Sequence, residues 1–237
     1  MNLKDIEHIF FDLDHTLWDF DKNSELAFDA IFKIHFKNVD ISTFMKVYIP
    51  INQECWRLYQ TDKISHDQLR YNRFKHSFDA IDIQISDDEI EFLAEKYLEL
   101  LPENNHLIED TIDVLEHLQQ KYQLHIITNG FMNVQHRKMQ NSGLHAYFQT
   151  VVNSEMAGVK KPDPKIFQTA IDLAKATASN SIMIGDSWEA DIIGAMNFDM
   201  PAIYFNQNAS QINVHEKFEY QLKHIEIRRL LEIKNIL

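Results

Sequence analysis

Asp12 and Asp14 are the residues whose type and spacing most directly indicate chemistry. These two carboxylates stand one residue apart, directly after the apolar run at residues 9–11 and before the hydroxyl of Thr16. Carboxylates this close repel each other and resist joint ionisation unless a cation or a shared proton lies between them. The pair therefore predicts either a metal site or a division into nucleophile and acid. The alternative is a strand end at which two aspartates cap a turn.

Polar side chains also follow three later apolar runs. Thr128, Asn129 and Gly130 follow residues 124–127, Lys161 lies in the loop after residues 151–152, and Asp186 and Ser187 follow residues 182–184. Ligands bind at the carboxyl ends of the strands in an open parallel sheet, so we expect these side chains to meet at one edge. Three carboxylates suit Mg²⁺, whereas a hydroxyl, backbone amides and a lysine suit a phosphoryl group.

The elements that must position these residues fall into two kinds. From residue 17 to residue 101 the spacing of apolar residues predicts helices, with Ser24, Ser65 and Ser86 as candidate N-caps and an interruption at Pro50. Beyond residue 102, helices alternate with short apolar runs, which is typical of a parallel sheet covered on both faces. We predict an α/β fold, a doubly wound parallel sheet with an inserted all-helical domain.

Composition and charge exclude several classes of protein. The 23 basic and 36 acidic residues give a net charge of −13, which disfavours binding to nucleic acid polymers or anionic membranes. The single cysteine, Cys55, rules out an intramolecular disulfide and a cysteine metal cluster. The first residues contain no apolar signal region and no run approaches a membrane span, so we expect a cytoplasmic enzyme or binding protein.

Four motifs occur in order, and their combination resembles the haloacid dehalogenase superfamily in its phosphatase branch. They are residues 12–16 (DLDHT), residues 128–130 (TNG), residues 161–162 (KP), and residues 185–187 (GDS) followed by Asp191. This resemblance implies a Rossmann-like core, residues 1–16 and 102–237, and a helical cap domain of the first type, residues 17–101. In finer detail, residues 11–20 and 128–131 look like those of bacterial pyrimidine-type nucleoside 5′-monophosphatases.

The resemblance also implies a role for each site residue. Asp12 would attack phosphorus and form an aspartyl-phosphate, and Asp14 would act as general acid and base. Thr128, Asn129, Gly130 and Lys161 would bind the phosphoryl group. Mg²⁺ would be held by Asp12, by the backbone carbonyl of Asp14 and by Asp186, with Ser187 and Asp191 in support.

Several functions remain open at the level of the sequence. An acid at position 14 favours phosphate ester hydrolysis over dehalogenation, because a halide leaves without a proton. A small phosphorylated metabolite, foremost a nucleoside 5′-monophosphate, is the expected substrate. Phosphoglycolate, a sugar phosphate, a mutase reaction, and a non-catalytic phosphometabolite-binding module are the alternatives. The sequence does not predict an oligomeric state.

Overall fold

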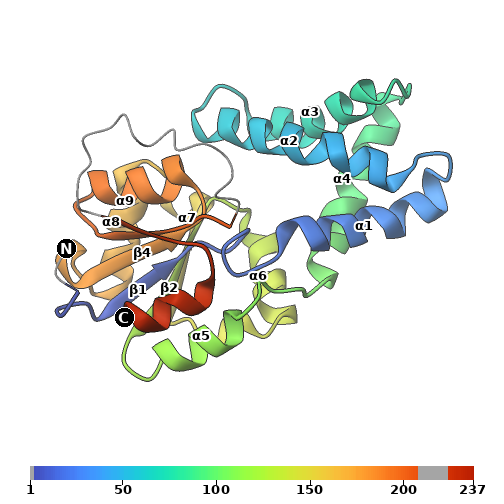
Figure 1. Cartoon of the computed structure of the whole chain (residues 1–237). Coiled ribbons are helices and arrows are strands. Elements are labelled where there is room, and N and C mark those ends of the chain that lie inside the picture. Colours follow the sequence, from blue (N-terminus) through green and yellow to red (C-terminus); the bar gives the residue numbers. More distant parts are fainter. Residues whose placement is uncertain (1–2, 208–223) are drawn as a thin grey trace. The chain divides into compact units, whose positions relative to one another are not determined.

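A six-stranded, wholly parallel sheet forms the centre of the computed structural model, which describes residues 3–207 and 224–237 (Figure 1). The strand order is β3-β2-β1-β4-β5-β6. The strands are β1 (His8–Phe11), β2 (Gln123–Thr128), β3 (Thr150–Asn153), β4 (Ser181–Gly185), β5 (Ala202–Phe205) and β6 (His224–Ile227). The order reverses between β1 and β4, which is the point where such sheets bind ligands. The predicted α/β fold with a doubly wound sheet is confirmed.

Both faces of the sheet are buried, which explains why its strands read as continuous apolar runs. On one face, Phe10 and Met183 pack in a core with Phe167 of α8 (Pro164–Ala174). Successive strand residues point to opposite faces, so Ile9 and Phe11, both fully buried, face the other way. In Figure 1, α8 lies on one side of the sheet and α5 (Thr111–Leu118) on the other.

Further helical segments lie between or after these strands along the chain. They are α6 (Met132–Asn141), α7 (Ser154–Ala157), α9 (Gly194–Asn197), the π-helical turn η4 (Trp188–Ile193), and the 3₁₀ segments η1 (Leu101–Glu103), η2 (Leu144–Ala146), η3 (Ala178–Asn180) and η6 (Leu230–Asn235). Sequence reasoning expects a single helix from Trp188 to Asn197, whereas the structure divides this stretch between η4 and α9. No helix within the described ranges is long and apolar enough to cross a membrane.

The chain divides into two compact units. Unit 1 comprises Met1–Asp19 and Leu107–Leu237, and unit 2 comprises Phe20–His106. Unit 2 contains the helices α1 (Phe20–His35), α2 (Ile41–Gln60), α3 (His66–Ala80) and α4 (Asp87–Leu100). The assignment of a catalytic core and a cap domain to particular residues stays a prediction.

Aromatic side chains hold unit 2 together. The ring of Phe28 stacks on Tyr97 at 4.6 Å between centroids and meets Tyr48 edge-on at 4.7 Å. Such pairs each add about 0.5–1.5 kcal/mol beyond their burial. The predicted N-caps Ser65 and Ser86 both form capping boxes, with Gln68 and Glu89 respectively.

Two details of the helices differ from the sequence prediction. Ser24 is not an N-cap, because α1 already begins at Phe20 and the buried Ser24 hydroxyl shares a hydrogen bond of 2.7 Å with Tyr97 Oη. Pro50 does not interrupt α2, which runs through it. Proline removes one backbone hydrogen bond at a cost of about 3 kcal/mol. The buried face of α2, which includes Phe44, Tyr48 and Cys55, offsets that cost.

Candidate active site

Lys161 is the centre of a buried polar cluster at the carboxyl edge of the sheet. Its ammonium donates to Asp12 Oδ1 at 2.6 Å, to Asp191 Oδ1 at 2.6 Å and to the carbonyl of Ile127 at 2.7 Å. An ammonium has three N–H groups, so these three acceptors use all of them. The side chain is only 2% exposed. Lys161 therefore fixes the carboxylates of Asp12 and Asp191 relative to β2.

The end of β1 brings Asp12 to this cluster. The backbone N–H of Asp12 donates to the carbonyl of Ile184 at 2.9 Å, which continues the β1–β4 ladder one residue beyond Phe11. Asp12 therefore leaves the sheet beside the end of β4, next to the loop that carries Asp186. This local geometry follows from the register Phe11–Ile184 and requires no special backbone conformation.

Asn129 anchors the loop that carries Lys161. Its Nδ2 donates to the carbonyl of Lys161 at 3.0 Å, and its Oδ1 accepts from the N–H of Lys161 at 2.7 Å. Both polar groups of this buried amide are therefore bonded to the lysine backbone. The side chain of Asn129 therefore positions Lys161, and the contact of Asn129 with a phosphoryl group stays a prediction.

Asp191 and Ser187 lie at the start of η4, after β4. The backbone N–H of Ser187 donates to Asp191 Oδ2 at 3.0 Å, and Ser187 Oγ caps η4 by accepting from the N–H of Ala190. Gly185 makes room for this arrangement, because a Cβ at that position would lie 2.2 Å from Asp191 Oδ2. Any side chain at Gly185 would displace the carboxylate that holds Lys161.

Asp14 turns toward α6 in the same unit. Its Oδ1 accepts from Lys138 Nζ at 2.6 Å, and its Oδ2 accepts from Gln135 Nε2 at 2.8 Å. Gln135 Nε2 also lies 2.8 Å from Thr128 Oγ1, so one amide joins the first and second motifs. Sequence reasoning missed Lys138 and Gln135. The available signal was their i, i+3 spacing beside the buried Met139, which places two polar residues on the inner face of α6.

Thr128 and Gly130 end β2 in a tight arrangement. The N–H of Gly130 donates to Thr128 Oγ1 at 3.1 Å. A Cβ on Gly130 would lie 2.3 Å from Gln135 Nε2, so glycine here lets α6 approach the strand end. The Thr128 hydroxyl oxygen therefore accepts hydrogen bonds both from the backbone of its own motif and from the Gln135 side chain.

The carboxyl groups of the cluster have raised pKa values. Burial raises the pKa of Asp12 to about 7, against the opposing charge of Lys161. Desolvation likewise raises the pKa of Asp186 to about 6 and shifts the pKa of Asp191 upward. Burial disfavours the Lys161 ammonium, but Asp12 and Asp191 outweigh it and raise the pKa of the lysine. One ammonium does not balance three carboxylates, so the cluster favours a further cation.

The donor set fits a divalent cation such as Mg²⁺. One carboxylate oxygen from each of Asp12, Asp186 and Asp191 lies within 4.8 Å of the others. Asp191 is the poorest ligand of the three, because both its oxygens already accept hydrogen bonds. Asp12 Oδ1 accepts a hydrogen bond from Lys161, and Asp186 Oδ1 accepts one from Thr16. The Oδ2 atoms of Asp12 and Asp186 accept no hydrogen bond from the residues that the structure describes. Hard oxygen ligands of this kind suit Mg²⁺.

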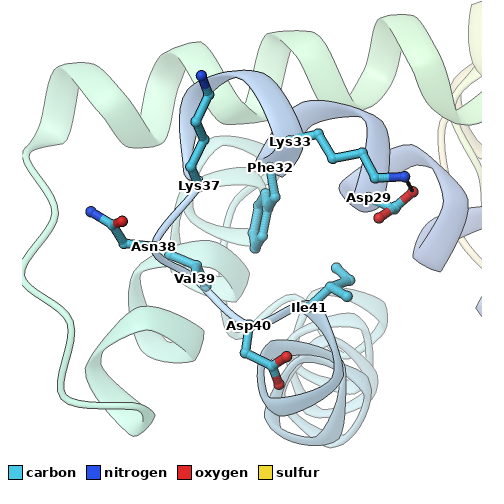
Figure 2. A pocket seen from close by; sticks show the side chains of 8 residues that line it. All are labelled: Asp29, Phe32, Lys33, Lys37, Asn38, Val39, Asp40 and Ile41. Atoms are coloured by element: carbon cyan, nitrogen blue, oxygen red, sulfur yellow. Dashed lines mark hydrogen bonds and ion pairs between the residues drawn. The ribbon is translucent and has the colours of Figure 1, made fainter.

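A pocket of about 560 Å³ lies within unit 2 and has a different character (Figure 2). It is lined by the end of α1, the following loop and the start of α2, including Phe32, Lys37 and Asp40. Lys33 forms an ion pair of 2.7 Å with Asp29 there, and Asp40 caps α2. Its charged groups are exposed and serve local structure, so the acidic cluster of unit 1 remains the candidate active site.

Comparison with known proteins identifies the family of this chain. Residues 6–199 match the family model of the haloacid dehalogenase-like hydrolases. The chain is 31% identical over 220 residues to pyrimidine 5′-nucleotidase PynA of Streptococcus pneumoniae, covering 90% of this chain and 91% of that protein. It is 30% identical over 200 residues to pyrimidine 5′-nucleotidase YjjG of Escherichia coli, covering 84% and 85%.

A solved structure has the same fold over nearly the whole chain. The HAD-hydrolase YfnB from Bacillus subtilis, described as bound to magnesium, superimposes with a TM-score of 0.84 at 27% identity. The match covers 98% of each chain.

Proposed function

The chain belongs to the haloacid dehalogenase-like hydrolase family, and from that premise we propose that it is a Mg²⁺-dependent phosphomonoesterase for small phosphorylated metabolites, foremost nucleoside 5′-monophosphates. One observation carries the proposal: the buried Asp12 carboxylate is held by Lys161, with a second carboxyl, Asp14, two residues on. A binding protein has no use for a nucleophile together with an acid. The Thr128 hydroxyl suits a phosphoryl oxygen, and the positive charge of Lys161 offsets the negative charge of the group.

The residues divide the reaction into two displacements. Asp12 attacks phosphorus, the bond from phosphorus to the leaving alcohol breaks, and Asp14 gives that oxygen its proton. The Asp14 carboxylate then takes a proton from water as the water oxygen bonds to phosphorus and the Asp12 carboxylate is released. Lys161 orients Asp12 and offsets the negative charge that gathers around it.

Mg²⁺ is the proposed cofactor. Asp12, Asp186 and the backbone carbonyl of Asp14 would hold the ion, and Asp191 would support the site through Lys161 and Ser187. The bound ion would shield the carboxylate nucleophile from the negative charge of a phosphate ester.

Nucleotides are the first substrates to test. Two relatives with about equal identity to this chain carry the name pyrimidine 5′-nucleotidase. Other relatives, at 25–30% identity, are called glyceraldehyde 3-phosphate phosphatase and N-acylneuraminate-9-phosphatase, so sugar phosphates belong in the same screen.

The test is a screen of UMP, dUMP, dTMP, phosphoglycolate and sugar phosphates, each with Mg²⁺ and with EDTA. We expect release of inorganic phosphate that requires Mg²⁺ and favours nucleotides, with purified Asp12→Asn as the control for contaminating phosphatase. Preference for a sugar phosphate would overturn the substrate class but leave the chemistry intact. Failure to hydrolyse any of these esters or 4-nitrophenyl phosphate would overturn the enzyme proposal in favour of a binding module.

A further inference from the structure

Two buried residues of α6 hold the acid of the proposed reaction. We propose that Lys138 and Gln135 are positioning residues that fix the Asp14 carboxyl in the orientation from which it protonates the leaving oxygen. This inference rests on the proposed phosphomonoesterase activity. It assigns a role in proton transfer to two residues of α6, a helix that lies outside the four motifs.

The geometry around Asp14 is specific. One donor contacts each oxygen: Lys138 Nζ contacts Oδ1 at 2.6 Å and Gln135 Nε2 contacts Oδ2 at 2.8 Å. Both donors come from side chains that are 1–2% exposed, whereas the Asp14 side chain itself is 22% exposed. A carboxyl held at both oxygens loses the rotation that a partly exposed side chain would otherwise keep.

The burial of Lys138 is costly unless it serves this purpose. A buried ammonium loses its hydration, and an ion pair recovers that cost only when its geometry is good. Lys138 has a good partner in Asp14, and its ammonium also lies 4.3 Å from the centroid of the Trp18 ring. An apolar residue at position 138 would fill the inner face of α6 more cheaply. The lysine is therefore better explained by what it does to Asp14 than by stability.

Gln135 connects the acid to the phosphoryl-binding motif. Its Nε2 lies 2.8 Å from both Asp14 Oδ2 and Thr128 Oγ1, and the close approach is possible because residue 130 is glycine. An acid is effective only within hydrogen-bond reach of the atom that it protonates. By joining Asp14 to Thr128, Gln135 sets the distance between the proton donor and the phosphoryl group.

The proton that Asp14 transfers shows how the positioning role of Lys138 and Gln135 can be measured. As Asp12 bonds to phosphorus, the ester bond to the leaving alcohol breaks and the proton moves from Asp14 to the departing oxygen. Lys138 then balances the negative charge left on Asp14. An alkyl alcohol needs this proton, whereas 4-nitrophenolate is a good leaving group and departs without it. Misplacing the acid therefore slows transfer of the phosphoryl group from alkyl esters to Asp12 and spares transfer from the aryl ester. The later release of Asp12 by water is the same step for both esters.

The experiment compares kcat/KM on UMP, or on the alkyl phosphate that the substrate screen ranks first, with kcat/KM on 4-nitrophenyl phosphate. This ratio reports the steps up to departure of the alcohol and not the later release of Asp12. We expect Lys138→Met to lower kcat/KM on the alkyl ester by about 10–100-fold, as a displacement of roughly 1 Å would. The loss on 4-nitrophenyl phosphate should be no more than about threefold. Lys138→Arg should restore most of the alkyl activity, because arginine keeps the charge and the donors.

Two further variants keep the test decisive. Gln135→Leu should reproduce the selective loss even where Lys138→Met folds poorly, and Lys138→Met should cost little when added to Asp14→Asn. Lys234→Met is the matched control, because Lys234 forms an ion pair of 2.7 Å with Asp113 in the same unit. It should leave both rates unchanged.

The outcomes separate the two proposals. Equal losses of kcat/KM on alkyl and aryl esters in folded variants, or no loss on either, would overturn the positioning role while the phosphatase proposal stands. If the wild-type protein hydrolyses neither ester, the proposed function fails and this inference fails with it.

Discussion

At the scale of single residues, the geometry of the candidate site depends most on Lys161. Three carboxylates, two of them buried and that of Asp186 partly buried, approach one another at the edge of the sheet, and the ammonium of Lys161 bonds to the two buried ones. The neighbouring Lys160 is partly exposed. Lys161 directly precedes Pro162 in the third motif, and the structure places this lysine in the cluster.

Lys161→Met should be far more damaging than Lys160→Met. The first substitution leaves Asp12 and Asp191 buried without their partner, which costs about 3–5 kcal/mol of unfolding free energy. We expect it also to abolish measurable phosphatase activity, whereas Lys160→Met should stay within about 0.5 kcal/mol and near wild-type activity. Denaturant unfolding and steady-state kinetics on the pair provide the measurement. Similar losses for both lysines would contradict the account.

At the scale of elements, the sequence predicts five strands and their order along the chain, at the apolar runs of residues 9–11, 124–127, 151–152, 182–184 and 202–205. It does not reveal β6, whose residues alternate between polar and apolar and which lies at the edge of the sheet. The inner face of α6 is also hidden, because its buried Gln135 and Lys138 carry no apolar signal. Polar residues that face a site from a helix look like surface residues until the helix is placed.

Within unit 2, Arg73 on α3 is a buried guanidinium that forms no ion pair with an acidic residue of the described ranges. It is 2% exposed, and its Nε and Nη2 have no hydrogen-bond partner among the described residues. It lies 4.8 Å from the centroid of the Phe74 ring and 5.1 Å from that of Tyr97, which compensates only part of the desolvation. Arg73→Met should therefore raise the unfolding free energy by about 1–2 kcal/mol. A loss of stability in denaturant unfolding would contradict this expectation.

The β1–β2 pair contains a buried histidine that should make stability depend on pH. His125 Nε2 lies 3.1 Å from His8 Nδ1, and His125 Nδ1 lies 2.8 Å from Thr150 Oγ1. Burial, aided by the charge of His8, lowers the pKa of His125 to about 4. The folded state therefore favours the neutral ring, and the unfolded state binds the proton near pH 6.5.

The stability contributed by neutral His125 should be complete above pH 6.5 and should disappear as the pH falls toward 4. The pKa difference corresponds to about 3 kcal/mol. We expect the unfolding free energy of wild type minus that of His125→Gln to shrink by roughly this amount from pH 7.5 to pH 4.5, because glutamine does not titrate in this range. A constant difference would show that His125 is not held neutral.

At the scale of the whole molecule, this acidic chain concentrates negative charge at the site where we propose that it binds an anionic substrate. The net charge is −13, and burial raises the pKa of Asp12 and Asp186. A divalent cation relieves that repulsion and binds the folded state alone, so it should stabilise the protein by mass action.

Mg²⁺ at about 100 times its Kd should add roughly 2.7 kcal/mol to the unfolding free energy. Asp186→Asn should lose this gain because it removes a predicted ligand, whereas the exposed neighbour Glu189→Gln should keep it. Thermal unfolding of the three proteins with and without Mg²⁺ is the measurement. An equal shift in Asp186→Asn would place the ion elsewhere.

The central claim is that Asp12 becomes covalently phosphorylated, and acid-quenched mass spectrometry tests it most directly. In Asp14→Asn, the water that releases Asp12 lacks its base, so the intermediate should accumulate after mixing with a good leaving-group ester such as 4-nitrophenyl phosphate. We predict that the peptide containing Asp12 gains the mass of one phosphoryl group. A phosphoryl group on another residue, or full turnover by Asp12→Asn, would contradict the account.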